Sequence, residues 1–319
     1  MKLHAWIEGI GVIGPGLANW TQAADVLAQR APYEAARTVL PAPASLPSAE
    51  RRRTGPVVRA ALAVGHEAVD ASGRDAATLA SVFAASGGDG VNCHAICETL
   101  STDDRQLSPT RFHNSVHNAA AGYWSIASHA RATANVLCAH DASFGAGLLE
   151  ALAQVAVDRV PTLLVAYDCE YPEPLRTVRP IADAFGVALV LAPVGHEARG
   201  DADRDVDIHV DGAARPRALA CIEAKLTDAP ATQLDAPEFE TLRANNPAAR
   251  VLPLLHALAT RQAASVVIDY LPETRVRLDV SWPDAAVDAD VDADVDADVD
   301  ADVDAAPDVA SGAPREAAP

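Results

Sequence analysis

The sequence predicts an α/β fold in which helices cover a mixed sheet. Short apolar segments alternate with longer helix-forming ones along the first part of the chain, and this order is typical of strands joined by covering helices. Segments 162–167 and 186–191 are almost continuously apolar, as strands buried on both faces of a sheet are. With 319 residues, half of them apolar, the chain can build one large domain or two small ones.

Strands and helices are expected to follow one another along the chain. Strands are expected at 4–11, 80–85, 134–137, 162–167 and 186–191. Helices are expected at 20–28, 57–70, 94–100, 115–129 and 143–157. Farther along, the pattern predicts a strand at 206–210, a helix at 251–261 and a hairpin of strands at 265–270 and 274–280, joined by a Leu-Pro-Glu turn.

Composition divides the chain into three segments. Residues 1–194 carry the strand–helix alternation, residues 195–282 form a short completing α+β segment, and residues 283–319 form an acidic tail. The tail repeats Val-Asp-Ala-Asp and holds eleven Asp, one Glu and one Arg. An EF-hand calcium loop would also need a Gly at its sixth position and a Glu at its twelfth, which the repeat lacks. We therefore expect a disordered acidic tail.

Charge, apolar runs and cysteine content exclude several classes of function. The net charge is −19, and no basic stripe offers a surface to nucleic acid. No apolar run approaches the ~18 residues of a membrane span, and Glu8 and Gly9 interrupt the start that a signal peptide would need. Five cysteines without paired spacing fit a reducing compartment. The sequence therefore predicts a cytoplasmic protein that binds neither nucleic acid nor membrane and uses no cofactor.

Several motifs occur in the order and spacing of one family. They are the Gly-rich turn in 7–16, Arg-Arg-Arg-Thr at 51–54, Phe-His-Asn-Ser-Val-His-Asn at 112–118, Asn-Ala-Ala-Ala-Gly at 118–122, Ser-Phe-Gly-Ala-Gly-Leu-Leu-Glu-Ala at 143–151 and the apolar strand 185–191. Together they resemble the N-terminal half of a β-ketoacyl synthase, and within that family the short chain length factor proteins of aryl polyene and related pigment pathways. The resemblance implies a thiolase-like α/β fold with a truncated C-terminal part.

The position of the family's cysteine nucleophile falls on Ala142 in this chain. A methyl group cannot accept an acyl chain. The family's two histidine motifs, His-Gly-Thr-Gly and Gly-His-x-x-Gly-Ala, are also missing, and Gly195-His196 is only a faint echo of the second. Asp141 is expected to cap the following helix, where its carboxylate would repel a thiolate or an oxyanion. The resemblance therefore implies a subunit that has lost the catalytic residues.

By the same resemblance, the helix that begins near residue 115 lies at a dimer interface and walls an acyl pocket. Its expected pocket or interface residues are Val116, Asn118, Gly122, Tyr123 and Trp124, and the two aromatic side chains are expected to be buried. The implied partner is an active β-ketoacyl synthase that acts on acyl carrier protein, with this chain as the chain length factor of the heterodimer. The acidic carrier protein is expected to dock on that partner, so that its contact with this acidic chain is indirect.

Two other functions are consistent with the residues. A shift of one residue puts the Ser143 hydroxyl at the nucleophile position with His140 as its base, which would give an acyltransferase or thioesterase for carrier-bound acyl chains. No Gly-x-Ser-x-Gly elbow surrounds this serine. The third possibility is a homodimeric scaffold without a ketosynthase partner. Cys138 is expected to be a buried thiol at the end of a strand.

Two loose clusters contain metal-ligating residue types. His113 and His117 stand one helical turn apart, and Cys93, His94 and Cys97 form a second group. A zinc site needs a third ligand beyond a histidine pair. We therefore expect hydrogen-bonding roles for the histidines and burial of the cysteine thiols along a helix, with no metal site.

Overall fold

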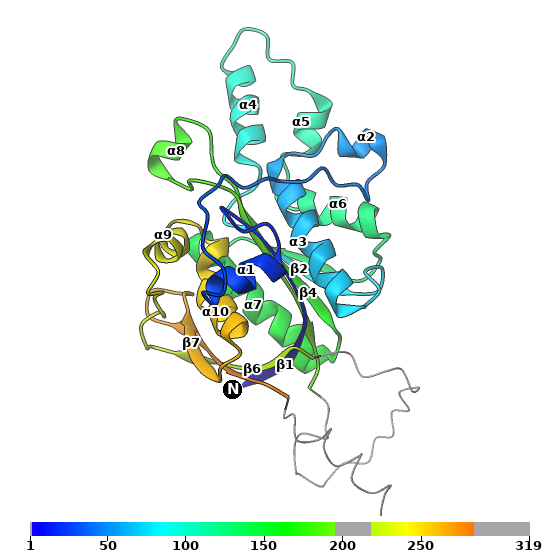
Figure 1. Cartoon of the computed structure of the whole chain (residues 1–319). Coiled ribbons are helices and arrows are strands. Elements are labelled where there is room, and N and C mark those ends of the chain that lie inside the picture. The colour runs from blue at the N-terminus through cyan, green and yellow to red at the C-terminus, as the bar shows by residue number, and fades with distance from the viewer. Residues whose placement is uncertain (1, 195–217, 284–319) are drawn as a thin grey trace, which may run out of the picture. The chain divides into compact units, whose positions relative to one another are not determined.

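The computed structural model describes residues 2–194 and 218–283, which build one mixed sheet of eight strands (Figure 1). The strands are β1 (Leu3–Ile13), β2 (Ala80–Ala84), β3 (Ala134–Leu137), β4 (Thr162–Asp168), β5 (Phe185–Ala192), β6 (Ala220–Thr227), β7 (Ala264–Ile268) and β8 (Arg275–Ser281). Their order across the sheet is β3-β2-β4-β5-β1-β6-β8-β7. β2 is parallel to β3 and β4, whereas the other neighbouring pairs are antiparallel.

Ten α-helices accompany the sheet in the described residues. They are α1 (Trp20–Leu27), α2 (Ser48–Arg51), α3 (Pro56–Ser72), α4 (Gly90–Leu100), α5 (Pro109–His113), α6 (Ala119–Ser128), α7 (Ser143–Ala153), α8 (Leu175–Val178), α9 (Pro237–Asn245) and α10 (Leu252–Thr260). A 3-10 turn, His140–Ala142, precedes α7, and a π turn, Gln154–Asp158, continues it. Over the same residues, no helix combines the length and the apolar character required to cross a membrane.

Helices pack on both faces of the sheet because its central strands are apolar on both sides. In β4, Leu164 and Ala166 pack in one core with α7, whereas Leu163 and Val165 pack in a second core with α3 and α6. Successive side chains of a strand point to opposite faces, so an uninterrupted apolar run supplies both cores. This arrangement explains why β4 and β5 are buried along their whole length.

The predicted elements that fall on described residues are confirmed, with three differences. The sequence pattern did not predict β6, although its burial alternates along Ala220–Thr227, and it did not predict α2, α5, α8 and α9. The helix predicted at 115–129, α6, begins at Ala119 and not at 115. Residues 114–118 form turns that precede α6. Asn114 anchors these turns, because its side-chain amide donates to the Arg53 carbonyl at 2.8 Å and accepts from the Tyr123 hydroxyl at 3.0 Å. The predicted strand 206–210 and the acidic tail lie outside the described residues.

The C-terminal strands repeat the arrangement of the first ones. In each case a helix leads into an antiparallel pair of strands whose second member lies beside an earlier strand: α7 precedes β4–β5–β1, and α10 precedes β7–β8–β6. Both helical segments end on an arginine with positive φ, Arg159 at 59° and Arg261 at 53°. β2 and β3 have no counterpart beside β7 in the described residues. Residues 218–283 thus form a shortened copy of the first half, joined to it through β1 and β6.

Candidate functional site

The turn between β3 and α7 contains Ala142, the residue on which motif spacing predicts the nucleophile position to fall. Ala142 is the last residue of the 3-10 turn, and its methyl group is 8% exposed. His140 at the start of that turn has a φ of 52°, which turns the chain sharply into the helix. The amide groups of the first turn of α7 follow directly after this methyl group. The geometry of a helix N-terminus is therefore present, without a side chain that could form an acyl bond.

Ser143 lies beside that position, but its hydroxyl is engaged with the backbone. The side chain is 1% exposed, its Oγ accepts from the Ala139 N–H at 3.0 Å, and it donates to the His140 carbonyl at 2.7 Å. The hydroxyl proton therefore points to a carbonyl and not to an imidazole. The His140 ring is exposed, and its Nε2 accepts from Arg179 at 2.9 Å. The structure thus does not bring Ser143 and His140 together as a nucleophile and its base.

Asp141 does not cap α7, which corrects the prediction from the sequence. The helix has no side-chain cap, and the Asp141 carboxylate turns to Arg179, with 2.7 Å between Oδ1 and Nη2. Arg250 contributes a second, longer approach at 3.9 Å. Both arginines come from segments far from Asp141 in the sequence, so the local pattern favoured a cap that the tertiary contacts replaced.

Charged groups of the C-terminal segment reach the same turn. Arg250, in the 3-10 turn before α10, pairs with Asp269 at 3.0 Å. The backbone carbonyl of Asp269 approaches Gly145 of α7 so closely that a Cβ there would lie 2.5 Å from it. Glycine is therefore required at 145 for the loop after β7 to pack on the start of α7. The chain's own second half thus covers part of the turn at Ala142.

A buried carboxylate that the sequence analysis did not single out lies nearby. Asp168, the last residue of β4, is 4% exposed, and its Oδ1 accepts from both the backbone N–H and the hydroxyl of Ser86, at 2.9 and 2.6 Å. Burial raises the pKa of Asp168 to about 7, against the opposing effects of the Ser86 hydrogen bonds and the Arg179 charge. An acidic residue at the end of an apolar strand was the sequence signal for this site, although nothing local identified Ser86 as its partner.

A second feature is an exposed apolar groove along α5 and α6. It has a volume of about 540 Å³ and is lined in part by Phe112, Val116, Gly122 and Ile126. Phe112 is 67% exposed and Val116 51% exposed. A Cβ at Gly122 would meet no atom within 4 Å, so this face of the helix is open. Asn118, at the N-cap position of α6, also lines the groove and makes no side-chain cap.

The two aromatic residues of α6 are buried, as expected. Tyr123 is 2% exposed and Trp124 1% exposed. The Trp124 ring packs on Gly65 of α3 and lies 6.4 Å, centroid to centroid, from Phe83 of β2. Trp124 therefore belongs to the chain's own core, whereas Tyr123 lines the groove from its inner side. Val116, Asn118 and Gly122 share that groove.

This geometry agrees with the comparison with known families. The sequence model of the β-ketoacyl synthase N-terminal domain matches residues 19–240. The chain belongs to the β-ketoacyl synthase family. No curated protein matches this ketosynthase-family chain by sequence.

Solved structures agree with the assignment at the level of the fold. The chain is similar to a chain of the ketosynthase ApeO in complex with its chain length factor ApeC from Xenorhabdus doucetiae, with a TM-score of 0.63, 19% identity, and coverage of 87% of this chain and 99% of that one. The ishigamide ketosynthase/chain length factor gives a TM-score of 0.62 at 14% identity, covering 88% and 100%. A type II polyketide synthase complex of an acyl-carrier protein with its ketosynthase gives 0.66 at 12%, covering 89% and 100%. The predicted thiolase-like α/β fold is thereby confirmed.

The cysteines of the ketosynthase-family chain differ from the prediction. Cys93 and Cys97 of α4 and Cys138 after β3 are exposed and not buried. α4 buries only one of its residues, so both thiols remain at the surface, and the Cys138 thiol donates to the Ser86 carbonyl at the end of the sheet. Within 2–194 and 218–283, no three His, Cys, Asp or Glu side chains are grouped closely enough to hold a metal ion.

Replacing Ser143 with alanine is expected to destabilise the chain without changing any acyl loading. The substitution would leave the Ala139 N–H and the His140 carbonyl without their partner in a buried turn, which costs about 1–2 kcal/mol. Urea unfolding measures this cost, with Ser101→Ala on the exposed end of α4 as the control. Mass spectrometry after incubation with acyl carrier protein measures loading. An acyl adduct on the unchanged chain that disappears in Ser143→Ala would contradict this expectation and support the serine enzyme.

Proposed function

We propose that this chain is a non-catalytic ketosynthase-like subunit, a chain length factor, that pairs with an active β-ketoacyl synthase acting on acyl carrier protein. In this role it shapes the acyl tunnel of its partner in polyketide or aryl polyene-type fatty acid biosynthesis in the cytoplasm. The observation that carries the proposal is the exposed apolar groove along α5 and α6. Exposed apolar patches of this kind mark surfaces that a partner covers.

The strand after α6 supports pairing on the same side of the chain. Within the described part of the chain, β3 hydrogen-bonds to β2 on one side only. An edge strand with unpaired backbone groups can add the strand of a partner to its sheet. The other edge, β7, is partly covered, because the Thr232 N–H donates to the Val267 carbonyl and the Thr232 hydroxyl accepts from the Val267 N–H, both at 2.9 Å. The free edge and the apolar groove therefore favour one interface.

The turn at Ala142 supports the non-catalytic half of the proposal. A methyl group stands at the nucleophile position, and the neighbouring hydroxyl of Ser143 donates to a backbone carbonyl. The Asp141 carboxylate of the same turn is paired with Arg179 at 2.7 Å, so it does not serve as a base for that hydroxyl. Condensation would then take place in the partner.

Known complexes of similar fold are consistent with this pairing. The structures compared above include ketosynthases in complex with chain length factors and one ketosynthase in complex with an acyl-carrier protein. Carrier proteins are acidic, and this chain carries a net charge of −19, so electrostatic repulsion disfavours it as the sole docking surface. We therefore place the carrier protein on the partner, next to this subunit.

Co-expression with the ketosynthase encoded nearest to this chain tests the proposal. Size-exclusion chromatography should give a one-to-one complex, and Gly122→Arg should weaken it about a hundredfold, because an unpaired charge would be buried in the interface. Gly122 has open space around it, so the variant should fold. Val157→Trp, at an exposed valine of the π turn, is a control for added surface bulk.

Product analysis separates pairing from control of chain length. Val116→Trp adds volume to the groove, and we expect the complex to remain and its products to become shorter. If the chain elutes alone, or as a dimer of itself, and the ketosynthase makes the same products without it, then the subunit function is wrong. A dimer of this chain with itself would leave the homodimeric scaffold as the remaining function. Acyl loading on Ser143 would be examined next.

A further inference from the structure

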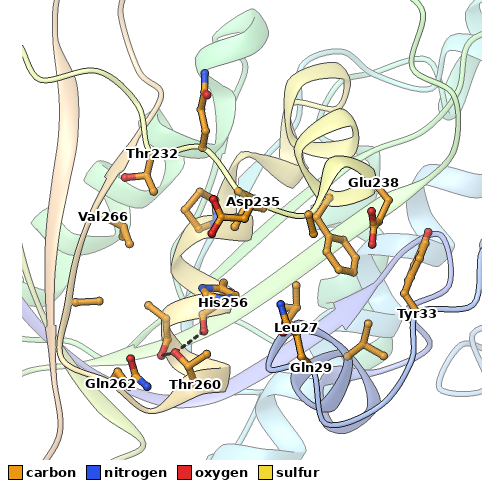
Figure 2. A pocket seen from close by; sticks show the side chains of 18 of the residues that line it. Leu27, Gln29, Tyr33, Thr232, Asp235, Glu238, His256, Thr260, Gln262 and Val266 are labelled. Atoms are coloured by element: carbon orange, nitrogen blue, oxygen red, sulfur yellow. Dashed lines mark hydrogen bonds between the residues drawn. The ribbon is translucent and has the colours of Figure 1, made fainter.

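A cavity of about 750 Å³ lies on the C-terminal half of the fold, between α1, α9, α10 and β7 (Figure 2). It is separate from the groove on α5 and α6, and the two share no lining residue. It lies beside β7, which is the edge strand of the sheet in the part of the chain that the structure describes. In the first half β2 packs on α7, whereas α10 contributes Pro253, His256 and Ala257 to the cavity wall. The volume is in the range of small-molecule sites.

The wall of the cavity is apolar and partly aromatic. Leu27 of α1, Phe239 of α9 and Val266 of β7 are buried side chains that line it. The rings of Tyr33 and Phe239 meet edge to face, with their centroids 5.0 Å apart. Aromatic rings of this kind attract cations to their faces. The site thus combines area for an apolar body with rings that favour positive charge.

The rim of the cavity adds negative charge. Asp235 and Glu238 line it, and neither forms an ion pair among the described residues. The cation on the same rim, Arg30, is already compensated, because it pairs with Asp25 at 2.9 Å and donates to the Ala259 carbonyl. Figure 2 shows Glu238 and Tyr33 on the same side of the cavity. The pKa of Tyr33 is raised by burial first and then by the charge of Glu238, so that charge acts at the aromatic wall.

We propose that this cavity binds a small organic cation, an amine or quaternary ammonium group carried on an apolar body. The apolar part lies against Leu27, Phe239 and Val266, and the positive group lies near Glu238 and the Tyr33 ring. A neutral molecule of the same shape gains only the apolar contacts, and an anion meets two carboxylates. The site is independent of the subunit function proposed above, because it uses neither the α6 groove nor the turn at Ala142.

Three probes with the same apolar body and different charge test the proposal: 3-phenylpropylamine, 3-phenylpropanol and 3-phenylpropionate. Calorimetric titration of the full chain at pH 8 should give millimolar or tighter binding of the amine. The alcohol should bind about fivefold more weakly, and the carboxylate more weakly still. In 0.5 M NaCl the preference for the amine should shrink, because the two rim carboxylates are exposed to salt.

Two variants at exposed positions locate the site. Glu238→Gln should reduce the preference for the amine over the alcohol and leave the affinity for the alcohol unchanged, whereas Glu273→Gln, at the exposed turn between β7 and β8, should change neither affinity. Ala263→Trp, on the rim, should weaken all three probes. The proposal is overturned if the amine binds no more tightly than the alcohol, if Glu238→Gln leaves their ratio unchanged, or if Ala263→Trp leaves binding intact.

Discussion

Replacing Trp124 with alanine is expected to lower the free energy of unfolding of the isolated chain by about 3–5 kcal/mol. The indole is the largest of the fully buried side chains, at 1% exposure, and it fills the space between α6, α3 and the sheet. It lies directly on Gly65, the His66 ring is 4.8 Å away from centroid to centroid, and Phe83 completes the contact. Truncation would leave a cavity that these neighbours cannot fill, because Gly65 has no side chain and Phe83 is fixed in β2.

Urea unfolding of the isolated chain measures this loss, and Trp124→Phe is the matched control. The indole Nε1 has no hydrogen-bond partner among the described residues, so phenylalanine removes volume without breaking a hydrogen bond and should cost less than half as much as alanine. A Trp124→Ala chain that unfolds like the unchanged one, but no longer binds a ketosynthase, would show instead that the indole serves an interface and not the core.

The second expected result concerns pH. The pKa of Asp168 is raised to about 7 by burial, whereas an unfolded aspartate titrates near 3.9. Between these values the folded chain binds a proton that the unfolded chain has released, so stability falls as the pH rises from 4 toward 7. The sequence isoelectric point is about 4.8, and solubility falls near it, so the measurement is best made between pH 5.5 and 8.5. Over that range Asp168 should reduce the free energy of unfolding by about 2 kcal/mol.

Asp168→Asn isolates this contribution from that of the other carboxylates. The asparagine keeps an oxygen that can accept from Ser86, and it does not ionise. The difference in free energy of unfolding between the variant and the unchanged chain should therefore increase by about 2 kcal/mol, in favour of the variant, as the pH rises across the same range. The control is Asp103→Asn, in an exposed loop. Its free energy of unfolding should differ from that of the unchanged chain by the same amount at every pH in the range. If the difference for Asp168→Asn is also constant with pH, then the carboxylate is already ionised in the folded chain over that range.

The buried strands were predictable because their pattern is local. β4 and β5 are apolar at nearly every position, and only a strand covered on both faces tolerates such a run. β6 was missed because Glu223 and Lys225 interrupt it, and they do so only because one face of that strand is solvated. The start of α6 was wrong by one turn because Asn114 binds Arg53, a contact between segments 61 residues apart.

The groove residues and the turn at Ala142 could be named from motif spacing, but their surroundings could not. The sequence favoured Asp141 as a helix cap, whereas Arg179 turns its carboxylate away from the helix. It allowed Ser143 to face His140, whereas the hydroxyl donates to a backbone carbonyl. Such choices depend on which distant groups arrive at the turn, and hydrogen bonds of similar strength compete for each side chain.

The sequence by itself determined the α/β class and the positions of the central strands, since periodicity is a property of neighbouring residues. Only the tertiary structure decided that Trp124 packs inward on Gly65 while Val116 and Gly122 face outward, and that residues 218–283 repeat the arrangement of the first half without counterparts of β2 and β3 among themselves. The physical reason is that burial, ion pairing and the opening of a cavity depend on which faces the assembled sheet covers, and no local stretch of the chain contains that information.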